Sequence, residues 1–265
     1  MLPDNFTPKV HLFETLDSTN DKARELAKTG SNEGTVVVAR RQTAGRGRNK
    51  RVWHSPPGGL YLSMLLYPKE AKRATDLSIV AGVALAQAVK TLLPKSKDVS
   101  VKWPNDCLVG WRKIGGVLCE NLGEELFNLC VVGIGLNINA SDEELLPFKS
   151  NPFSATSFRL ETGGDFDLER AQAMLVQKLL NVYRHYQTEG FAAIQFLWEK
   201  NCGMVGKKVE LRDSGTRPAG EHNPGHVGST TGTFLGIDDS GAVVLSNAKG
   251  ERHIYHSGEI TCFWP

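Results

Sequence analysis

Residues 99–120 read VSVKWPNDCLVGWRKIGGVLCE, and two strands of a sheet are expected within them. The first strand is the β-branched run over residues 99–103, and the second is the apolar run over residues 114–120. Pro104 has no N–H to donate to a neighbouring strand, so it ends the pairing, and residues 105–106 (Asn-Asp) are expected in a turn. This stretch therefore predicts sheet structure with polar side chains at the end of a strand.

Strands and helices alternate on both sides of this stretch up to about residue 200. Further strands are predicted at residues 35–39, 60–67 and 126–138. Helices are predicted at residues 18–30, 76–93, 167–187 and 191–200. The first helix has Asp21 three residues after Ser18, as in a capping box, and Asp167 is expected to cap the third. The second is apolar nearly all round, so we expect it to be buried against the sheet.

The pattern changes after residue 201. Short alternating strands separated by Gly and Asp turns continue to the end of the chain, which implies a small β-barrel or sandwich. A stretch rich in Gly, Pro and polar residues at about 213–231 is expected to be a long loop within it. We therefore predict an α+β protein, with a mixed-sheet domain and packed helices over residues 1–200 and a small β domain over residues 201–265.

Composition excludes several classes of protein. The 265 residues carry 31 Lys and Arg against 29 Asp and Glu, a net charge of +2, which is too little for a protein that coats nucleic acid. The 5 cysteines form no CxxC pair, so neither a disulfide framework nor a metal site is indicated. The N-terminus has no apolar signal region, and no segment suggests a membrane span, for which about 18 apolar residues are needed. We expect a cytoplasmic protein.

Positive charge is concentrated in residues 42–53, QTAGRGRNKRVW. Two glycines allow the backbone N–H groups to point into one concavity, and three arginines add guanidinium groups that match carboxylates and phosphates: Gly45, Gly47, Arg46, Arg48 and Arg51. A solvated basic hairpin is the plain alternative. Trp53 favours a site, because an aromatic ring just past the charges can cover a flat ligand.

The 99–120 stretch carries a second group of polar and glycine residues. Lys113 precedes Gly115 and Gly116, whose lack of side chains lets a ligand lie against the backbone. Asn105 and Asp106 stand at the end of the preceding strand. Each feature alone is typical of an ordinary turn or a solvated lysine, but their combination with the arginine loop favours an anion-binding site.

These motifs occur together in the order and spacing of a known family. They are STN (18–20), QTAGRGR (42–48), SPPGGLYLSMLL (55–66), VKWPND (101–106), KIGGVL (113–118) and GIGLNIN (133–139). Over roughly residues 10–200 the chain resembles biotin protein ligases, also called biotin–[acetyl-CoA-carboxylase] ligases, and its C-terminal part is similar to that family's SH3-like barrel. The resemblance implies that the protein joins biotin to ATP's α-phosphate, giving biotinyl-5′-AMP, and then transfers biotin to a lysine of a biotin carboxyl carrier domain.

The resemblance also implies roles for individual residues. The catalytic group comprises Lys113, Arg48 and Asp106, with Asp106 either orienting Lys113 or helping to deprotonate the incoming lysine. The biotin site comprises Ser18, Thr19, Asn20, Gln42, Gly45, Arg46, Gly47, Arg48, Lys113, Gly115 and Gly116. The ATP site comprises Arg46, Arg48, Arg51, Trp53, Lys102, Asn105, Lys113 and Asn137. Mg²⁺ is expected to enter with the ATP phosphates, since the sequence shows no carboxylate cage for it.

Some features depart from the family pattern or leave alternatives open. Asn49 and Lys50 stand where other members often have Gly or Arg. The chain begins almost at the catalytic domain, so the monofunctional type is expected, without an N-terminal helix-turn-helix domain, DNA binding or membrane association, and a homodimer is allowed. Two alternatives are a lipoate or octanoyl transferase on a related fold and a non-catalytic anion- or RNA-binding protein. The polar quartet of Ser18, Thr19, Asn20 and Gln42 suits a ureido ring and favours biotin.

Overall fold

The computed structural model describes residues 6–68, 74–123, 129–148, 153–212 and 228–264. Within them a mixed seven-stranded sheet forms the larger domain, in the order β1-β2-β3-β7-β6-β5-β4. Its strands are β1 (Val10–Leu16), β2 (Val36–Gln42), β3 (Leu60–Leu66), β4 (Val99–Lys102), β5 (Asp106–Val109), β6 (Arg112–Asn121) and β7 (Cys130–Leu136). β1 and β2 are parallel, and every other neighbouring pair is antiparallel.

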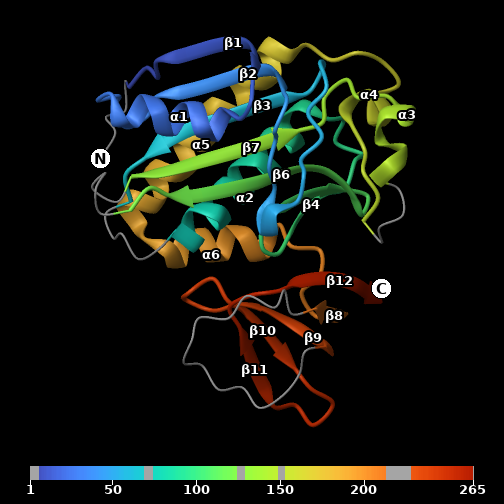
Figure 1. The fold of residues 1–265 in the computed structure, drawn as a ribbon. Helices are drawn as coiled ribbons and strands as arrows, with labels where there is room; N and C mark the ends of the chain where they lie inside the picture. Colours follow the sequence, from blue (N-terminus) through green and yellow to red (C-terminus); the bar gives the residue numbers. More distant parts are fainter. Residues whose placement is uncertain (1–5, 69–73, 124–128, 149–152, 213–227, 265) are drawn as a thin grey trace.

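Helices cover both faces of this sheet. The long helices are α1 (Thr19–Lys28), α2 (Ala74–Leu92), α5 (Leu168–Glu189) and α6 (Phe191–Lys200). Alternate residues of a strand face opposite sides, so Val36 and Val38 pack in the same core cluster as α2 and α5, while Val37 packs in a second cluster with α1. Figure 1 shows α1 in front of the sheet and α5 behind it.

The predicted helices and most predicted strands are present, with shifted ends. Asp167 caps α5, because its carboxylate accepts hydrogen bonds from the N–H groups of Glu169 and Arg170. The predicted capping box of α1 is absent: Ser18 stands at the N-cap position but its side chain makes no capping hydrogen bond. β1 and β5 were not predicted. Asp106 begins β5 and does not lie in a turn, so that expectation was wrong.

Helix α2 meets the length and composition of a membrane span over Thr75–Leu92, which the sequence analysis did not anticipate. Of this segment, 67% is buried inside the protein, between the sheet and helices α5 and α6. Burial of that extent is typical of a core helix, so its apolar character is accounted for by packing.

Five antiparallel strands form a second, smaller sheet within the described residues, in the order β11-β10-β9-β8-β12. They are β8 (Lys208–Arg212), β9 (Ser229–Ile237), β10 (Val243–Ser246), β11 (Arg252–Tyr255) and β12 (Glu259–Trp264). The edge strands β11 and β12 do not pair with each other there, so the SH3-like barrel is open. Of the loop expected at 213–231, residues 229–231 belong to β9, and residues 213–227 lie outside the described residues.

The two sheets share one hydrophobic core. α6 lies between the larger domain and the smaller sheet (Figure 1), and Trp198 on α6 packs against Phe234 of β9, with ring centroids 6.2 Å apart. Buried Trp103, next to β4, donates a hydrogen bond from Nε1 to the carbonyl oxygen of Gly241 at 2.9 Å. The smaller sheet is therefore held in a definite position beside the end of β4.

Candidate functional site

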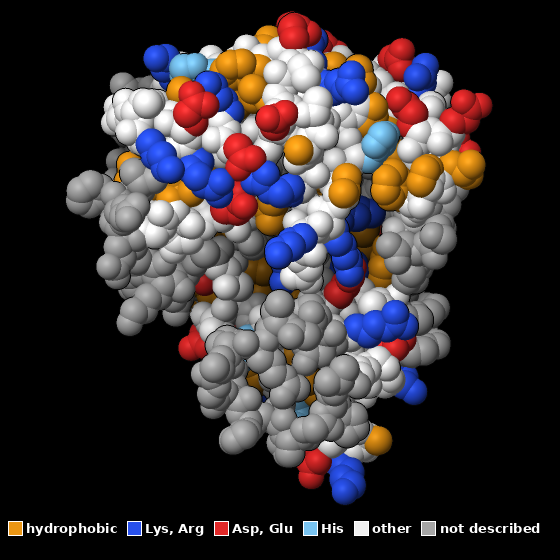
Figure 2. All heavy atoms as spheres, viewed as in Figure 1, with side chains coloured by type: hydrophobic (Ala, Val, Ile, Leu, Met, Phe, Trp, Pro, Cys, Tyr) orange, Lys and Arg blue, Asp and Glu red, His pale blue; other side chains and the backbone are white. Residues whose placement is uncertain are grey.

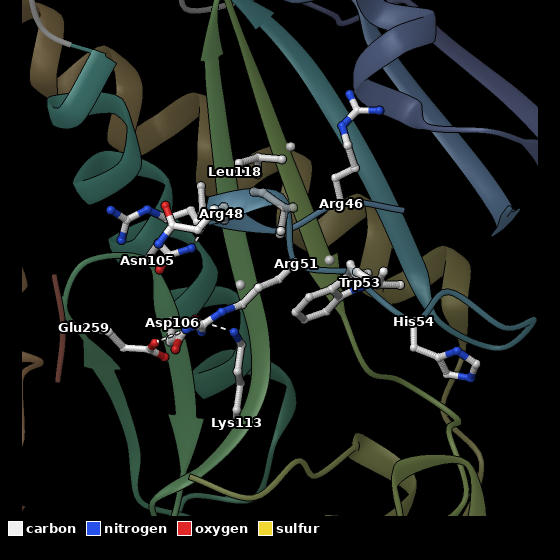
Figure 3. A pocket seen from close by; sticks show the side chains of 18 of the residues that line it. Arg46, Arg48, Arg51, Trp53, His54, Asn105, Asp106, Lys113, Leu118 and Glu259 are labelled. Atoms are coloured by element: carbon white, nitrogen blue, oxygen red, sulfur yellow. Dashed lines mark hydrogen bonds and ion pairs between the residues drawn. The ribbon is translucent and has the colours of Figure 1, made fainter. Parts of the chain in front are cut away.

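A cavity of about 490 Å³ opens between α1, the 42–54 loop, the neighbouring strands β6 and β7, and the start of β12. Every predicted site residue lines it except Gly45 and Gly115. Figure 3 shows side chains from both sheets directed into this space. Motifs far apart in the sequence therefore meet in one cavity.

The two glycines outside the lining are needed for close packing. A Cβ on Gly45 would lie 2.5 Å from Ser55 Oγ and from the carbonyl oxygen of Trp53, and one on Gly115 would lie 2.9 Å from the carbonyl oxygen of Gly135. The N–H of Gly47 donates to the carbonyl oxygen of Arg51 at 2.7 Å. That N–H therefore closes a hairpin, which differs from the expected cradle of free N–H groups.

The 42–54 loop has a left-handed backbone conformation at two consecutive residues. Asn49 and Lys50 have φ values of 55° and 59°, a conformation that favours glycine. Both are non-glycine residues, so this turn is held in a backbone conformation that L side chains rarely adopt.

One end of the cavity is a compact set of neutral hydrogen-bonding groups. Gln42 Oε1 accepts from the N–H of Thr19 at 2.8 Å, and the Ser63 hydroxyl lies 2.6 Å from Asn20 Oδ1 and 2.8 Å from Thr19 Oγ1. A Cβ on Gly133 would overlap Asn20, so β7 needs glycine there. Gly133 lines the cavity but received no role from the sequence, although it begins the motif over residues 133–139. Ser63, in the motif over residues 55–66, is fully buried and positions Asn20.

Arg46 does not face the centre of the cavity. Its guanidinium makes a bidentate ion pair with Asp21 of α1, at 2.6 and 2.7 Å, and points away from Lys113 (Figure 3). The Arg46 guanidinium holds the pKa of Asp21 below its usual value, although partial burial opposes this. The pair fixes the loop to α1, and it also explains why Asp21 forms no capping box.

The centre of the cavity holds two lysines around one buried carboxylate. Asp106 Oδ1 lies 2.6 Å from Lys113 Nζ, and Oδ2 accepts from Lys102 Nζ at 3.0 Å. Burial alone would raise the pKa of Asp106, but the two ammonium groups outweigh it and hold that pKa well below its usual range. Asp106 is therefore ionised at neutral pH and is a weak base.

The smaller sheet contributes an acidic residue that the sequence analysis missed. Glu259, at the start of β12, lies 2.6 Å from Arg51 Nη2 and 3.8 Å from Lys102 Nζ. Burial alone would raise the pKa of Glu259, but the hydrogen bond from Arg51 and the charge of Lys102 outweigh burial and hold that pKa below its usual value. Glu259 thus links the two domains across the cavity.

Arg48 also lines the cavity and is substantially desolvated. Burial lowers the pKa of its guanidinium, partly offset by the charges of Asp106 and Glu259. An arginine remains charged despite such a shift, because its ordinary pKa is above 12. Together with Arg51, Lys102 and Lys113, it makes this end of the cavity suited to a polyanion, and Figure 2 shows Lys and Arg side chains gathered around the hollow above the smaller domain.

Trp53 lies between the charged and neutral parts. Its ring packs against β7 so closely that a Cβ on Gly135 would overlap it, and Lys113 Nζ is 5.2 Å from the ring centroid. Its Nε1 is buried without a hydrogen-bond partner in the described part of the chain. The amide of Asn137 donates to the carbonyl oxygen of Thr156 at 3.0 Å, which fixes its orientation at the cavity wall.

Comparisons with known proteins agree with this arrangement. Residues 12–137 match the family model "Biotin/lipoate A/B protein ligase family", and residues 227–261 match "Biotin protein ligase C terminal domain". The chain is 34% identical to the Bacillus subtilis bifunctional ligase/repressor BirA, covering 91% of this chain and 70% of that protein. It is 33% identical to the biotin–[acetyl-CoA-carboxylase] ligase of Paracoccus denitrificans, covering 92% and 96%.

Solved structures show the same similarity. The biotin protein ligase from Aquifex aeolicus, in complex with biotin and ATP, superposes with a TM-score of 0.75 at 28% identity, and the match covers 97% of each chain. The similarity therefore includes both sheets and the cavity between them.

Proposed function

The chain belongs to the biotin protein ligases, and we propose that its cavity uses ATP to activate biotin and passes it to a lysine of a biotin carboxyl carrier domain. The observation that carries this proposal is the joining, in one cavity, of a neutral polar end to a cluster of cations. In the first step a biotin carboxylate oxygen attacks the α-phosphorus of ATP, and pyrophosphate leaves. In the second, the lysine amine attacks the biotinyl carbonyl carbon, and AMP leaves.

We assign biotin's ureido ring to the neutral end. Thr19, Asn20 and Gln42 line this end, and their hydroxyl and amide groups are held in position by hydrogen bonds, including one that the fully buried Ser63 hydroxyl donates to Asn20. A ureido group needs both donors and acceptors in a pocket that excludes water, and a neutral polar set satisfies it without a charge. A lipoyl or octanoyl chain has no such group and could not bond to the donors and acceptors at this end of the cavity.

We assign the carboxylate and the α-phosphate to the region around Lys113. Two anions must approach each other there, and a fixed ammonium group reduces their repulsion and stabilises charge in the transition state. Asp106 orients Lys113 and Lys102 in this proposal, because a carboxylate with a lowered pKa accepts a proton poorly. Of the two roles open for Asp106 from the sequence, the geometry favours that of an orienting group.

We assign the nucleotide to the side lined by Trp53, Asn137 and the arginines. The Trp53 ring offers a flat face, and Arg48 and Arg51 suit the phosphates. Among the described residues no cluster of three or more His, Cys, Asp or Glu side chains could hold a metal ion. We therefore propose that Mg²⁺ enters with the nucleotide, whose phosphates supply most of its ligands.

Pyrophosphate release separates biotin ligation from the lipoate alternative. The protein is incubated with MgATP and, separately, biotin, lipoate or octanoate. Release with biotin alone supports the proposal, and release with lipoate but not biotin contradicts it. The cytoplasmic location remains a prediction, and sedimentation of the purified protein tests whether it forms the homodimer that the sequence allows.

A further inference from the structure

A buried carboxylate outside the cavity joins three separate parts of the chain. Glu161, on the short helix α4 (Phe158–Thr162), accepts hydrogen bonds from Thr156 Oγ1 at 2.7 Å, Arg112 Nη2 at 2.6 Å and Lys97 Nζ at 2.9 Å. Its side chain is 1% exposed. Neither Glu161 nor these partners line the cavity, so no role in substrate contact accounts for them.

One partner of Glu161 belongs to a segment that braces Lys113. The N–H of Lys113 donates to the carbonyl oxygen of Ser154 at 2.8 Å, and the N–H of Thr156 donates to the carbonyl oxygen of Lys113 at 2.9 Å. Residues 154–156 thus run beside Lys113 as a short parallel bridge. Glu161 also holds Arg112, the residue before Lys113, so the backbone of Lys113 is held from two sides.

The same segment braces Asn137 at the end of β7. The carbonyl oxygen of Thr156 accepts from the Asn137 side chain at 3.0 Å, and the N–H of Phe158 donates to the Asn137 carbonyl oxygen at 3.1 Å. Thr156 is fully buried. A shift of Thr156 would therefore move the Asn137 amide and the Lys113 backbone together.

We infer that Glu161 is a positioning residue for biotin adenylation, acting through Thr156 and Arg112 on Lys113 and Asn137. The inference rests on the proposed function. Lys113 Nζ and Asp106 Oδ1 are only 2.6 Å apart, a fit that a small movement of the Lys113 backbone disrupts. Misplacement of a reacting group by about 1 Å can cost up to roughly 10²-fold in rate.

The test compares four variants of the whole protein. Glu161→Gln removes the charge, and Thr156→Val removes the hydroxyl at nearly constant volume, whereas Thr156→Ser retains the hydroxyl. Glu33→Gln is the matched control, because Glu33 also lies outside the cavity and accepts two hydrogen bonds, but from Tyr183 Oη and the N–H of Tyr67, which do not brace Lys113 or Asn137. For each variant we would measure melting temperature, biotin affinity, and pyrophosphate release per active site titrated by its burst of biotinyl-5′-AMP.

We expect Glu161→Gln and Thr156→Val to lower kcat per active site by about tenfold and to raise KM for ATP, with biotin affinity retained. Thr156→Ser should restore kcat, and Glu33→Gln should lower the melting temperature without changing either constant. Normal kcat per active site in both Glu161→Gln and Thr156→Val, alongside an active wild type, overturns the inference alone. Failure of the wild type to form biotinyl-5′-AMP overturns the proposed function and this inference with it.

Discussion

The Lys113→Ala substitution removes an ammonium group from the centre of the cavity while leaving the neighbouring carboxylate paired. Lys102 Nζ remains 3.0 Å from Asp106 Oδ2. The cluster of two lysines and one aspartate has a formal charge of +1, and the variant has a charge of 0. The region assigned to the carboxylate and the α-phosphate therefore loses the net positive charge of this cluster, together with the N–H donors of Lys113.

A donor fixed where charge develops in the transition state contributes about 3 to 4 kcal/mol, so adenylation should slow by a factor of about 10² to 10³. The Lys113 side chain is 30% exposed but its partner Asp106 is buried, so losing one of the two charged hydrogen bonds to Asp106 should lower the unfolding free energy by about 1 to 3 kcal/mol, which is less than the roughly 5 to 15 kcal/mol that stabilises a typical domain. The loss of activity is thus expected in a folded protein.

Biotin-dependent pyrophosphate release measures the effect, and urea unfolding checks the fold. Lys28→Ala is the control, because Lys28 is an exposed lysine at the end of α1, outside the cavity. Lys113→Arg keeps the charge but places its donors differently, so it should recover only part of the rate. Release by Lys113→Ala within about threefold of wild type, in a variant that urea unfolding shows to be folded, would refute the electrostatic role assigned to Lys113.

Arg48→Gly should weaken retention of biotinyl-5′-AMP more than it weakens its synthesis, so activated biotin should escape and label a bystander protein. A blot for biotin that shows label on the carrier domain alone would contradict this. Glu259→Gln removes the ion pair with Arg51 and should lower the free energy of unfolding at neutral pH. Because the pKa of Glu259 is lower in the folded protein, the wild type's extra stability is present above the ordinary pKa of 4.5 and is lost as the pH falls through the lowered pKa. Urea midpoints at pH 7 and pH 3 test that, and an equal difference at both would be inconsistent with it. Gly135→Ala should displace the Trp53 ring, because the added Cβ would overlap it, so the KM for ATP should rise. Calorimetry should show that biotin affinity is retained, and an unchanged KM would show that Trp53 is not part of the nucleotide site.

Local sequence patterns predicted most of the larger domain because its core elements are strongly periodic or continuously apolar. The helix over residues 76–93 and the strand over residues 60–67 are examples, and both are found as α2 and β3. β5 was missed because it has only four residues directly after the turn at Pro104. β1 was missed because it lies at the edge of the sheet and exposes Val10 and Leu12, which blurs its alternation.

Motifs predicted the cavity residues that carry charged or amide groups, whereas residues whose role depends on a distant partner were missed. Glu259 lies more than 200 residues from Arg51 in sequence, on the other sheet, so no local pattern could connect them. The orientation of the Arg46 side chain could not be predicted either, because it is set by an ion pair with Asp21 on α1. Gly133 and Gly135 read as part of a strand, and their need for small size becomes visible only against Asn20 and Trp53.

Mass spectrometry of a biotin carrier domain incubated with the protein, biotin and MgATP tests the proposed biotin transfer. One lysine of the carrier should gain a biotinyl group, the gain should require both biotin and ATP, and Lys113→Ala should slow it by a factor of about 10² or more. A carrier that stays unmodified by a folded protein able to bind biotin, or one that gains a lipoyl or octanoyl group in place of biotin, would contradict it.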